Sequence, residues 1–171
     1  KMEDPMTIKA ALVLTALATA TPLCAQDASE GDAASLDAIA KLGFFVGEWT
    51  GESSAMMGPG GTQTSQLTER ASLRAGGAVL LLEGRGTVME EGEQRVIHDA
   101  FGAITWDPRS GTYQIRAFRA GQGWTDSELV VDGRRLEWGM ETPGGRVRFT
   151  LDFSEEGLWH EIGEIERGGQ I

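Results

Sequence analysis

The feature that most constrains this chain is a two-residue alternation of apolar and polar side chains, which recurs from about residue 45 to residue 166. The clearest run is Arg146–Phe153, in which every second residue, from Val147 onward, is apolar. A period of two is typical of a β-strand that buries one face. The sequence therefore predicts an all-β domain.

Turn-forming clusters such as Asp107-Pro108 and Asp132-Gly133 separate these segments, and 24 of the 171 residues are glycine. No helical stretch long enough for a parallel crossover lies between them, so neighbouring strands should be antiparallel. A long meander of this kind closes into an up-and-down, calycin-like barrel of about nine to ten strands, or splits into a β-sandwich as the second possibility. The strands are predicted, in order, over 45–53, 62–74, 78–89, 94–106, 112–120, 124–131, 134–142, 146–153 and 158–166.

Both ends of the chain carry further expectations. Ser35 can cap a short helix over 36–42, which Gly43 ends, and 26–35 is predicted to be a flexible acidic leader before a domain over 36–171. The segment 168–171 looks like a turn and the start of another strand. We therefore expect a truncated fragment or an open barrel whose last strand is not bonded to its first.

Residues 1–25 have the pattern of a leader and secretory signal peptide. Lys9 precedes an apolar run over 10–20, then Pro22 and a small residue at Ala25, after which we expect cleavage. The run is too short to span a bilayer. Cys24 is the one cysteine, and the bulky Leu23 before it disfavours lipidation. The mature protein is therefore expected to be periplasmic or secreted, without a disulfide or a membrane anchor.

Charge narrows the classes of partner. Fifteen Lys and Arg against 26 Asp and Glu give a net charge of −11, which disfavours nucleic acid and anionic lipid surfaces. No nucleotide-binding, nucleophile-elbow or zinc-protease motif is present. We expect no metal and no cofactor, and a homodimer remains possible.

One segment resembles a known family. Gly47-Glu48-Trp49-Thr50-Gly51, which follows the short helix, is similar to the opening of a large bacterial family of lipocalin-like domains of unknown function. The segments His98-Asp99-Ala100 and Trp159-His160-Glu161 resemble it as well, so the likeness covers about residues 36–167. It implies a calycin-type barrel with an internal cavity. Nitrobindin-like and fatty-acid-binding-protein-like barrels are more distantly similar, but the haem-ligand motif of nitrobindins has no match here, so haem is not expected.

Several residues are candidates for a ligand site. The aromatic residues lie on apolar parities, as barrel core or as the lining of a cavity, and both histidines can point into the lumen on strand parity. Glu83 and Arg85 share one face of their strand. If that face is inside, the two residues form an internal anchor for a ligand; if it is outside, they form a solvated ion pair. The candidates are Trp49, Glu83, Arg85, His98, Trp106, Tyr113, Arg116, Trp138, Phe149 and His160.

The sequence leads to three functional hypotheses. The first is a non-catalytic barrel that binds a small apolar or amphipathic molecule in its cavity. The second is a cavity enzyme that uses His98 or His160 as an acid or base, which requires a carboxylate or an arginine within reach. The third is a scaffold or interaction domain. Glu161 and Glu164 fall on opposite faces of their strand and cannot form a close carboxylate pair.

Overall fold

The computed structural model describes residues 30–56 and 61–166. Over these ranges nine antiparallel strands follow one another in sequence order, each bonded to the next, so the predicted meander is confirmed. Every strand that the alternation predicts is present. The strands are β1 (Gly47–Met56), β2 (Thr62–Arg74), β3 (Val79–Glu90), β4 (Glu93–Asp107), β5 (Thr112–Arg119), β6 (Gly123–Asp132), β7 (Arg135–Thr142), β8 (Gly145–Asp152) and β9 (His160–Glu166).

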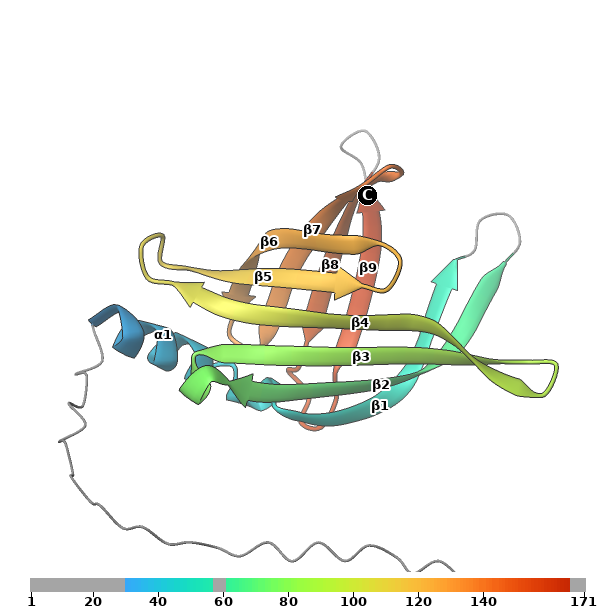
Figure 1. Ribbon diagram of the computed structural model, residues 1–171, viewed down its shortest axis with the longest axis horizontal. Helices are drawn as coiled ribbons and strands as arrows, with labels where there is room; N and C mark the ends of the chain where they lie inside the picture. The colour runs from blue at the N-terminus through green and yellow to red at the C-terminus, as the bar shows by residue number, and fades with distance from the viewer. Residues whose placement is uncertain (1–29, 57–60, 167–171) are drawn as a thin grey trace, which may run out of the picture.

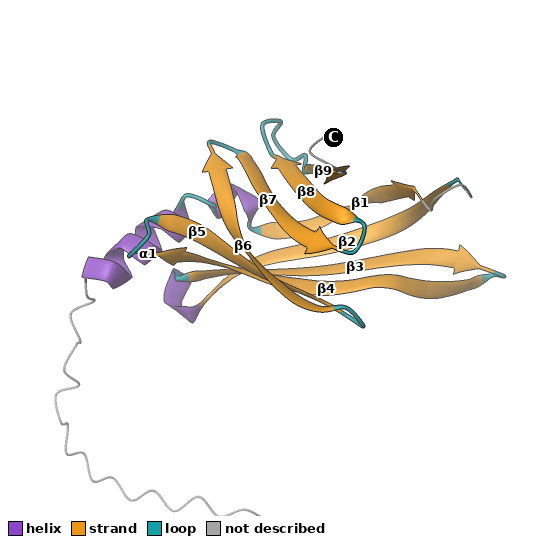
Figure 2. Ribbon diagram, turned by 90° about the horizontal axis from the view of Figure 1, so that it is seen from above, coloured by secondary structure: helices purple, strands orange, loops and turns teal. Residues whose placement is uncertain are grey.

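The sheet curls into a half-barrel. Strands β3, β4 and β5 run side by side across the front of Figure 1, while β7, β8 and β9 lie behind them at a steep angle, as Figure 2 also shows. The order of strands starts at β1 and ends at β9, and these two are not neighbours within the described part of the sheet. The half-barrel therefore has an open seam between β1 and β9, which agrees with the expected open barrel and not with a two-sheet sandwich.

The N-terminal helix is longer than predicted. Helix α1 spans Glu30–Ala40, so part of the expected flexible leader is helical, and Ser35 lies within the helix and does not cap it. Acidic residues near the N-terminus of a helix are favoured by its dipole, and Ala33 and Ala34 are strong helix formers. A 3-10 turn at Gly43–Phe45 then leads into β1. The predicted signal peptide, cleavage site and residues 168–171 lie outside the described ranges.

The hydrophobic core fills one end of the half-barrel, where α1 packs against the inner face of the sheet (Figure 1). The hydroxyl of Tyr113 donates a hydrogen bond of 2.8 Å to the carbonyl of Ala38 and ties the helix to β5. Burial of these apolar side chains is the main force that holds the helix against the sheet. The largest fully buried side chains are Phe45, Phe153, Ile39, Leu42, Leu80, Ile104 and Leu136.

Strand register assigns each side chain to the inner or the outer face. Trp49 on β1 pairs with Glu69 on β2, and Glu69 pairs with Gly84 on β3, so these three residues share a face. Side chains two residues apart in a strand share a face, so Leu67 and the buried Ala71 lie on the same face as Glu69. This face is therefore the inner one. Residues one position away along each strand face outward.

Candidate functional site

The aromatic candidates lie on the inner face, and most belong to the core. Trp106 and Tyr113 pack edge to face with ring centres 4.8 Å apart, and Trp138 stacks on Phe149 at 4.6 Å. All four pack in or against the buried core cluster. These residues support the core interpretation more than a cavity lining.

Trp49 closes the same end of the half-barrel, as expected of an indole at the start of the first strand. Its Nε1 donates to the carbonyl of Phe45 at 3.0 Å, and its ring meets Phe153 at 5.6 Å and Trp159 at 6.1 Å, both edge to face. Trp159, from the loop before β9, also packs on Phe45 at 4.8 Å. Trp49 and Trp159 are only partly buried, so part of each indole stays accessible.

The two histidines lie on opposite faces. His98 on β4 pairs with Gly86 on the inner face and is half-buried, and burial, followed by the charge of Arg119, lowers its pKa. It forms no side-chain hydrogen bond with a carboxylate or an arginine in the part of the chain that the structure describes. His160 pairs with Asp152 and faces outward, because its neighbour Glu161 pairs with the buried, inward-facing Leu151. The lumenal position predicted for His160 is therefore wrong.

Glu83, Arg85 and Arg116 also face outward. Glu83 and Arg85 are exposed, which selects the solvated alternative for this pair. The guanidinium of Arg116 binds Asp126 through two hydrogen bonds, one of them 2.7 Å from Nη2 to Oδ2. None of these three side chains can act as an internal anchor.

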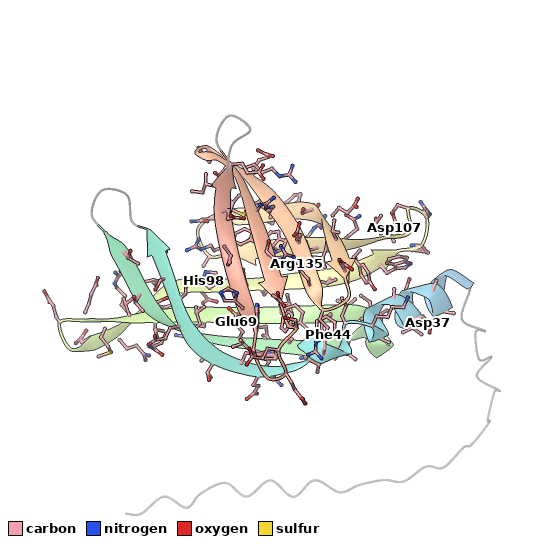
Figure 3. All side chains as sticks on the ribbon, turned by 180° about the vertical axis from the view of Figure 1, so that it is seen from behind. Asp37, Phe44, Glu69, His98, Asp107 and Arg135 are labelled. Atoms are coloured by element: carbon pink, nitrogen blue, oxygen red, sulfur yellow. The ribbon has the colours of Figure 1, made fainter. Side chains whose placement is uncertain are left out.

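A site that the sequence analysis missed lies on the inner face beside the aromatic cluster. It consists of Glu69 on β2, Glu161 on β9, and the two indoles next to them, Trp49 and Trp159; we call these four residues the Glu69–Glu161 site. Trp49 is the register partner of Glu69, and Glu161 comes two residues after Trp159. Figure 3, which shows the half-barrel from the side on which β9 lies in front, labels Glu69 and His98 close to that strand.

Gly84 provides the space in which the Glu69 carboxyl group lies. A Cβ atom at Gly84 would come 2.6 Å from Oε1 and 2.8 Å from Cδ of Glu69, closer than real Cβ contacts allow. The carboxyl group is therefore held against the backbone of β3, and Glu69 is half-buried. A side chain at this position of β3 would therefore displace the carboxyl group of Glu69.

The two carboxyl groups have strongly raised pKa values. Burial, and to a smaller extent repulsion from Glu161, together raise the pKa of Glu69 from 4.5 to about 7. Burial likewise raises the pKa of Glu161 to about 7. Glu161 is an exposed residue, so solvent screens part of this effect of burial on its charge. Near neutral pH both groups are therefore close to half-protonated.

Among the described residues, the buried Nε1 atom of Trp159 makes no hydrogen bond of ordinary geometry. It lies near enough to Glu161 to lower the pKa of that carboxyl group, against the larger effect of burial. An unpaired buried donor costs about 1–3 kcal/mol. The site therefore has one N–H group available for an acceptor.

No arginine or lysine forms an ion pair with Glu69 or Glu161 in the described ranges, although seven ion pairs form elsewhere in them. Those pairs use other acidic residues, such as Glu164, whose carboxylate lies 2.8 Å from Arg148 on the outer face. The Glu69–Glu161 site is therefore an uncompensated acidic site, since nothing in the described structure supplies the positive charge that would favour ionisation.

Sequence analysis missed this site because β2 is polar on both parities and β9 has apolar residues on both. The parity of Leu67, Glu69 and Ala71 was nevertheless a usable signal that Glu69 faces inward. For β9, the apolar Ile162 favoured the face that the structure places outside. Over residues 30–56 and 61–166, no three His, Cys, Asp or Glu side chains come together as a metal site.

Comparisons with protein-family models, with curated proteins and with solved structures find no match to this chain. The resemblance to lipocalin-like domains therefore stays a prediction. No helix within the described ranges has the length and apolar character needed to cross a membrane.

Proposed function

We propose that the protein binds a small amphipathic molecule that carries a basic amino group, with that group held between Glu69 and Glu161. The observation that carries the proposal is the pair of inward-facing carboxyl groups without a cationic partner in the described structure. A ligand ammonium group would supply the missing charge and so favour the ionised form of both groups. Binding of this kind requires no catalysis.

The two tryptophans support a cationic ligand as well. Trp49 and Trp159 lie edge to face beside the carboxyl groups, and the face of an indole attracts a cation. The unpaired Nε1 of Trp159 can donate to an oxygen atom of the same ligand. The site thus combines an acidic, an aromatic and a hydrogen-bonding component.

An apolar part of the ligand has a place further along the same face of β9, about 13 Å from Glu161. Val147 on β8 and Ile165 on β9 are register partners on the inner face, and 48% of Ile165 is exposed along the seam. Covering such surface gains about 25 cal/mol per Å². This surface is the reason that we propose an amphipathic ligand and not a simple cation.

Tryptophan fluorescence titration with octylamine tests the proposal, with octanoate and octanol as probes of equal chain length. At pH 8 octylamine should bind, and Glu69→Gln or Glu161→Gln should weaken binding at least about tenfold, because a hydrogen bond to a charged group is worth about 1.5–3 kcal/mol. Glu128→Gln, an exposed change on the outer face, is the matched control. Equal binding of octanoate, or binding that both glutamine variants retain, would contradict the proposal.

Acid–base chemistry is a second candidate for the same site, and one observation favours it. Carboxyl groups with pKa values of about 7 can both donate and accept a proton at neutral pH, which is the property that catalytic carboxyl groups need. A bound ligand that is chemically altered after incubation with the unmodified protein, but not with Glu69→Gln, would favour catalysis. A ligand that is recovered unchanged would favour binding alone.

A further inference from the structure

A row of outward-facing side chains crosses six strands on the other face of the sheet. Register links one residue of each strand to the next, from β1 to β6, so the row runs across the strands and not along them. With strands about 4.8 Å apart, it is about 24 Å long. In order the row consists of Glu48, Arg70, Glu83, Phe101, Phe118 and Trp124.

The second half of the row is an aromatic platform. Phe101 and Phe118 stack with ring centres 4.4 Å apart and planes 14° apart. Trp124 is 61% exposed, and the guanidinium of Arg116 lies 4.7 Å from its ring centre, where Asp126 holds it. Exposed aromatic groups that are fixed in place in this way mark an interaction surface more often than chance exposure does.

The row lies in an open groove of about 1120 Å³. The groove is lined mainly by outward-facing residues of β1–β6, and the inward-facing Trp49, Glu69, Gly84 and Arg119 alternate with them along the strands. Its volume exceeds what a small ligand requires, and its open sides do not enclose a ligand as a lipid-binding cavity does. An elongated occupant that extends across the strands fits this shape best.

The charges in the groove nearly balance one another. Its acidic lining residues, Glu48, Glu69, Glu83 and Asp99, are opposed by three arginines, Arg70, Arg85 and Arg119, which leaves one negative charge in excess. No single sign of charge therefore selects an anionic or a cationic partner. The charged groups provide many hydrogen-bond donors and acceptors at one end, and the aromatic platform provides flat apolar surface at the other.

The geometry points to a binding site for a linear, uncharged oligosaccharide in this groove, along the row of outward-facing side chains. Sugar rings have an apolar face that packs on aromatic rings, and hydroxyl groups that bind carboxylates and guanidinium groups. A chain of such rings is elongated, neutral and polar along its edges, which matches the length, charge balance and open sides of the groove. Trp124, the most exposed of the three rings, would carry the main stacking contact, and the stacked pair of Phe101 and Phe118 would add apolar contacts beside it.

Isothermal titration with neutral hexasaccharides tests this inference. The probes are cellohexaose, maltohexaose, mannohexaose and xylohexaose, with hexagalacturonate and chitosan hexamer as acidic and basic comparisons. At least one neutral hexamer should bind, and Trp124→Ala should weaken it about tenfold, because tryptophan truncation at a binding centre commonly costs more than 1 kcal/mol. Met89→Ala, 69% exposed and outside the groove lining, should leave binding unchanged.

Three results would overturn the inference. None of the neutral hexamers binds; a charged hexamer binds more tightly than every neutral one; or Trp124→Ala binds as well as the unmodified protein. A dimer seen by analytical ultracentrifugation that Trp124→Ala dissociates would also overturn the inference. That result would identify the groove as an interface between two copies of the chain. Because Trp124 is largely exposed, Trp124→Ala should unfold at the same temperature as the unmodified protein, so loss of binding cannot be attributed to loss of fold.

Discussion

Glu69→Gln should make the protein more stable at pH 8 and leave its stability nearly unchanged at pH 4.5. In the folded protein burial and Glu161 raise the pKa of Glu69 from 4.5 to about 7. Between pH 4.5 and about pH 7, Glu69 has lost its proton in the unfolded chain but retains it in the folded chain. The free energy of unfolding must therefore fall as pH rises through this window, and it stays low above about pH 7.

The magnitude follows from the same values. One pH unit corresponds to about 1.4 kcal/mol, so a rise of the Glu69 pKa from 4.5 to about 7 would cost about 3–4 kcal/mol without solvent screening. Because the seam admits solvent and screens part of this cost, we expect Glu69→Gln to gain about 1–2 kcal/mol at pH 8. Glu161 is more exposed, so Glu161→Gln should gain less.

Urea unfolding, followed by tryptophan fluorescence at several pH values, measures this effect. The quantity of interest is the difference in free energy of unfolding between Glu69→Gln and the unmodified protein, since other groups contribute the same pH dependence to both. Glu128→Gln, exposed on the outer face, should give a difference that does not change with pH. If Glu69→Gln behaves like Glu128→Gln, the carboxyl group is solvated, and the reasoning about the inner face fails.

Three further changes probe the same fold and site. Tyr113→Phe should lower the free energy of unfolding by about 1 kcal/mol in urea, because it removes the hydrogen bond to the carbonyl of Ala38. Gly84→Ala should move the pKa of Glu69, read by carboxyl NMR titration, with little loss of stability, because the added Cβ displaces the flexible end of the Glu69 side chain. Phe153→Ala should lower the free energy of unfolding by about 3–5 kcal/mol, since Phe153 is fully buried among four aromatic rings. A loss of less than about 1 kcal/mol would contradict that packing.

The fold could be read from the sequence because strands and turns leave local signals. The apolar residues of β8 recur every second position, and the Asp132-Gly133 turn joins β6 to β7, with Gly133 in the left-handed region at φ 59°. The loop itself is Gly133-Arg134, one residue later than predicted, because Asp132 pairs with Arg135. Such shifts arise because tertiary pairing, and not turn preference alone, fixes the last bonded pair of a hairpin.

The site was less predictable because it depends on which strands meet across the half-barrel. Glu69 and Glu161 are 92 positions apart in the sequence, and only curling of the whole sheet brings β2 and β9 near each other. The outward Glu83 and Arg85 looked equally suitable as internal anchors, since parity along one strand does not say which side is the inside. The inner face of β3 becomes known only from its pairing with β2, in which Leu82 lies opposite the buried Ala71.

The inner face thus combines two unlike regions that have different effects on stability. At one end Phe45 and Phe153 exclude water and hold α1, and beside them Glu69 and Glu161 keep ionisable groups at a concave surface where ionisation is unfavourable. A leucine at position 69 would remove that cost but would provide nothing for a charged ligand to bind. A sequence that places two mutually repelling carboxyl groups beside two indoles breaks the ordinary rules of core design, and such breaks are expected where a protein binds or reacts. The stability gained by Glu69→Gln should therefore come with loss of amine binding, because one unpaired carboxyl group is the cause of both.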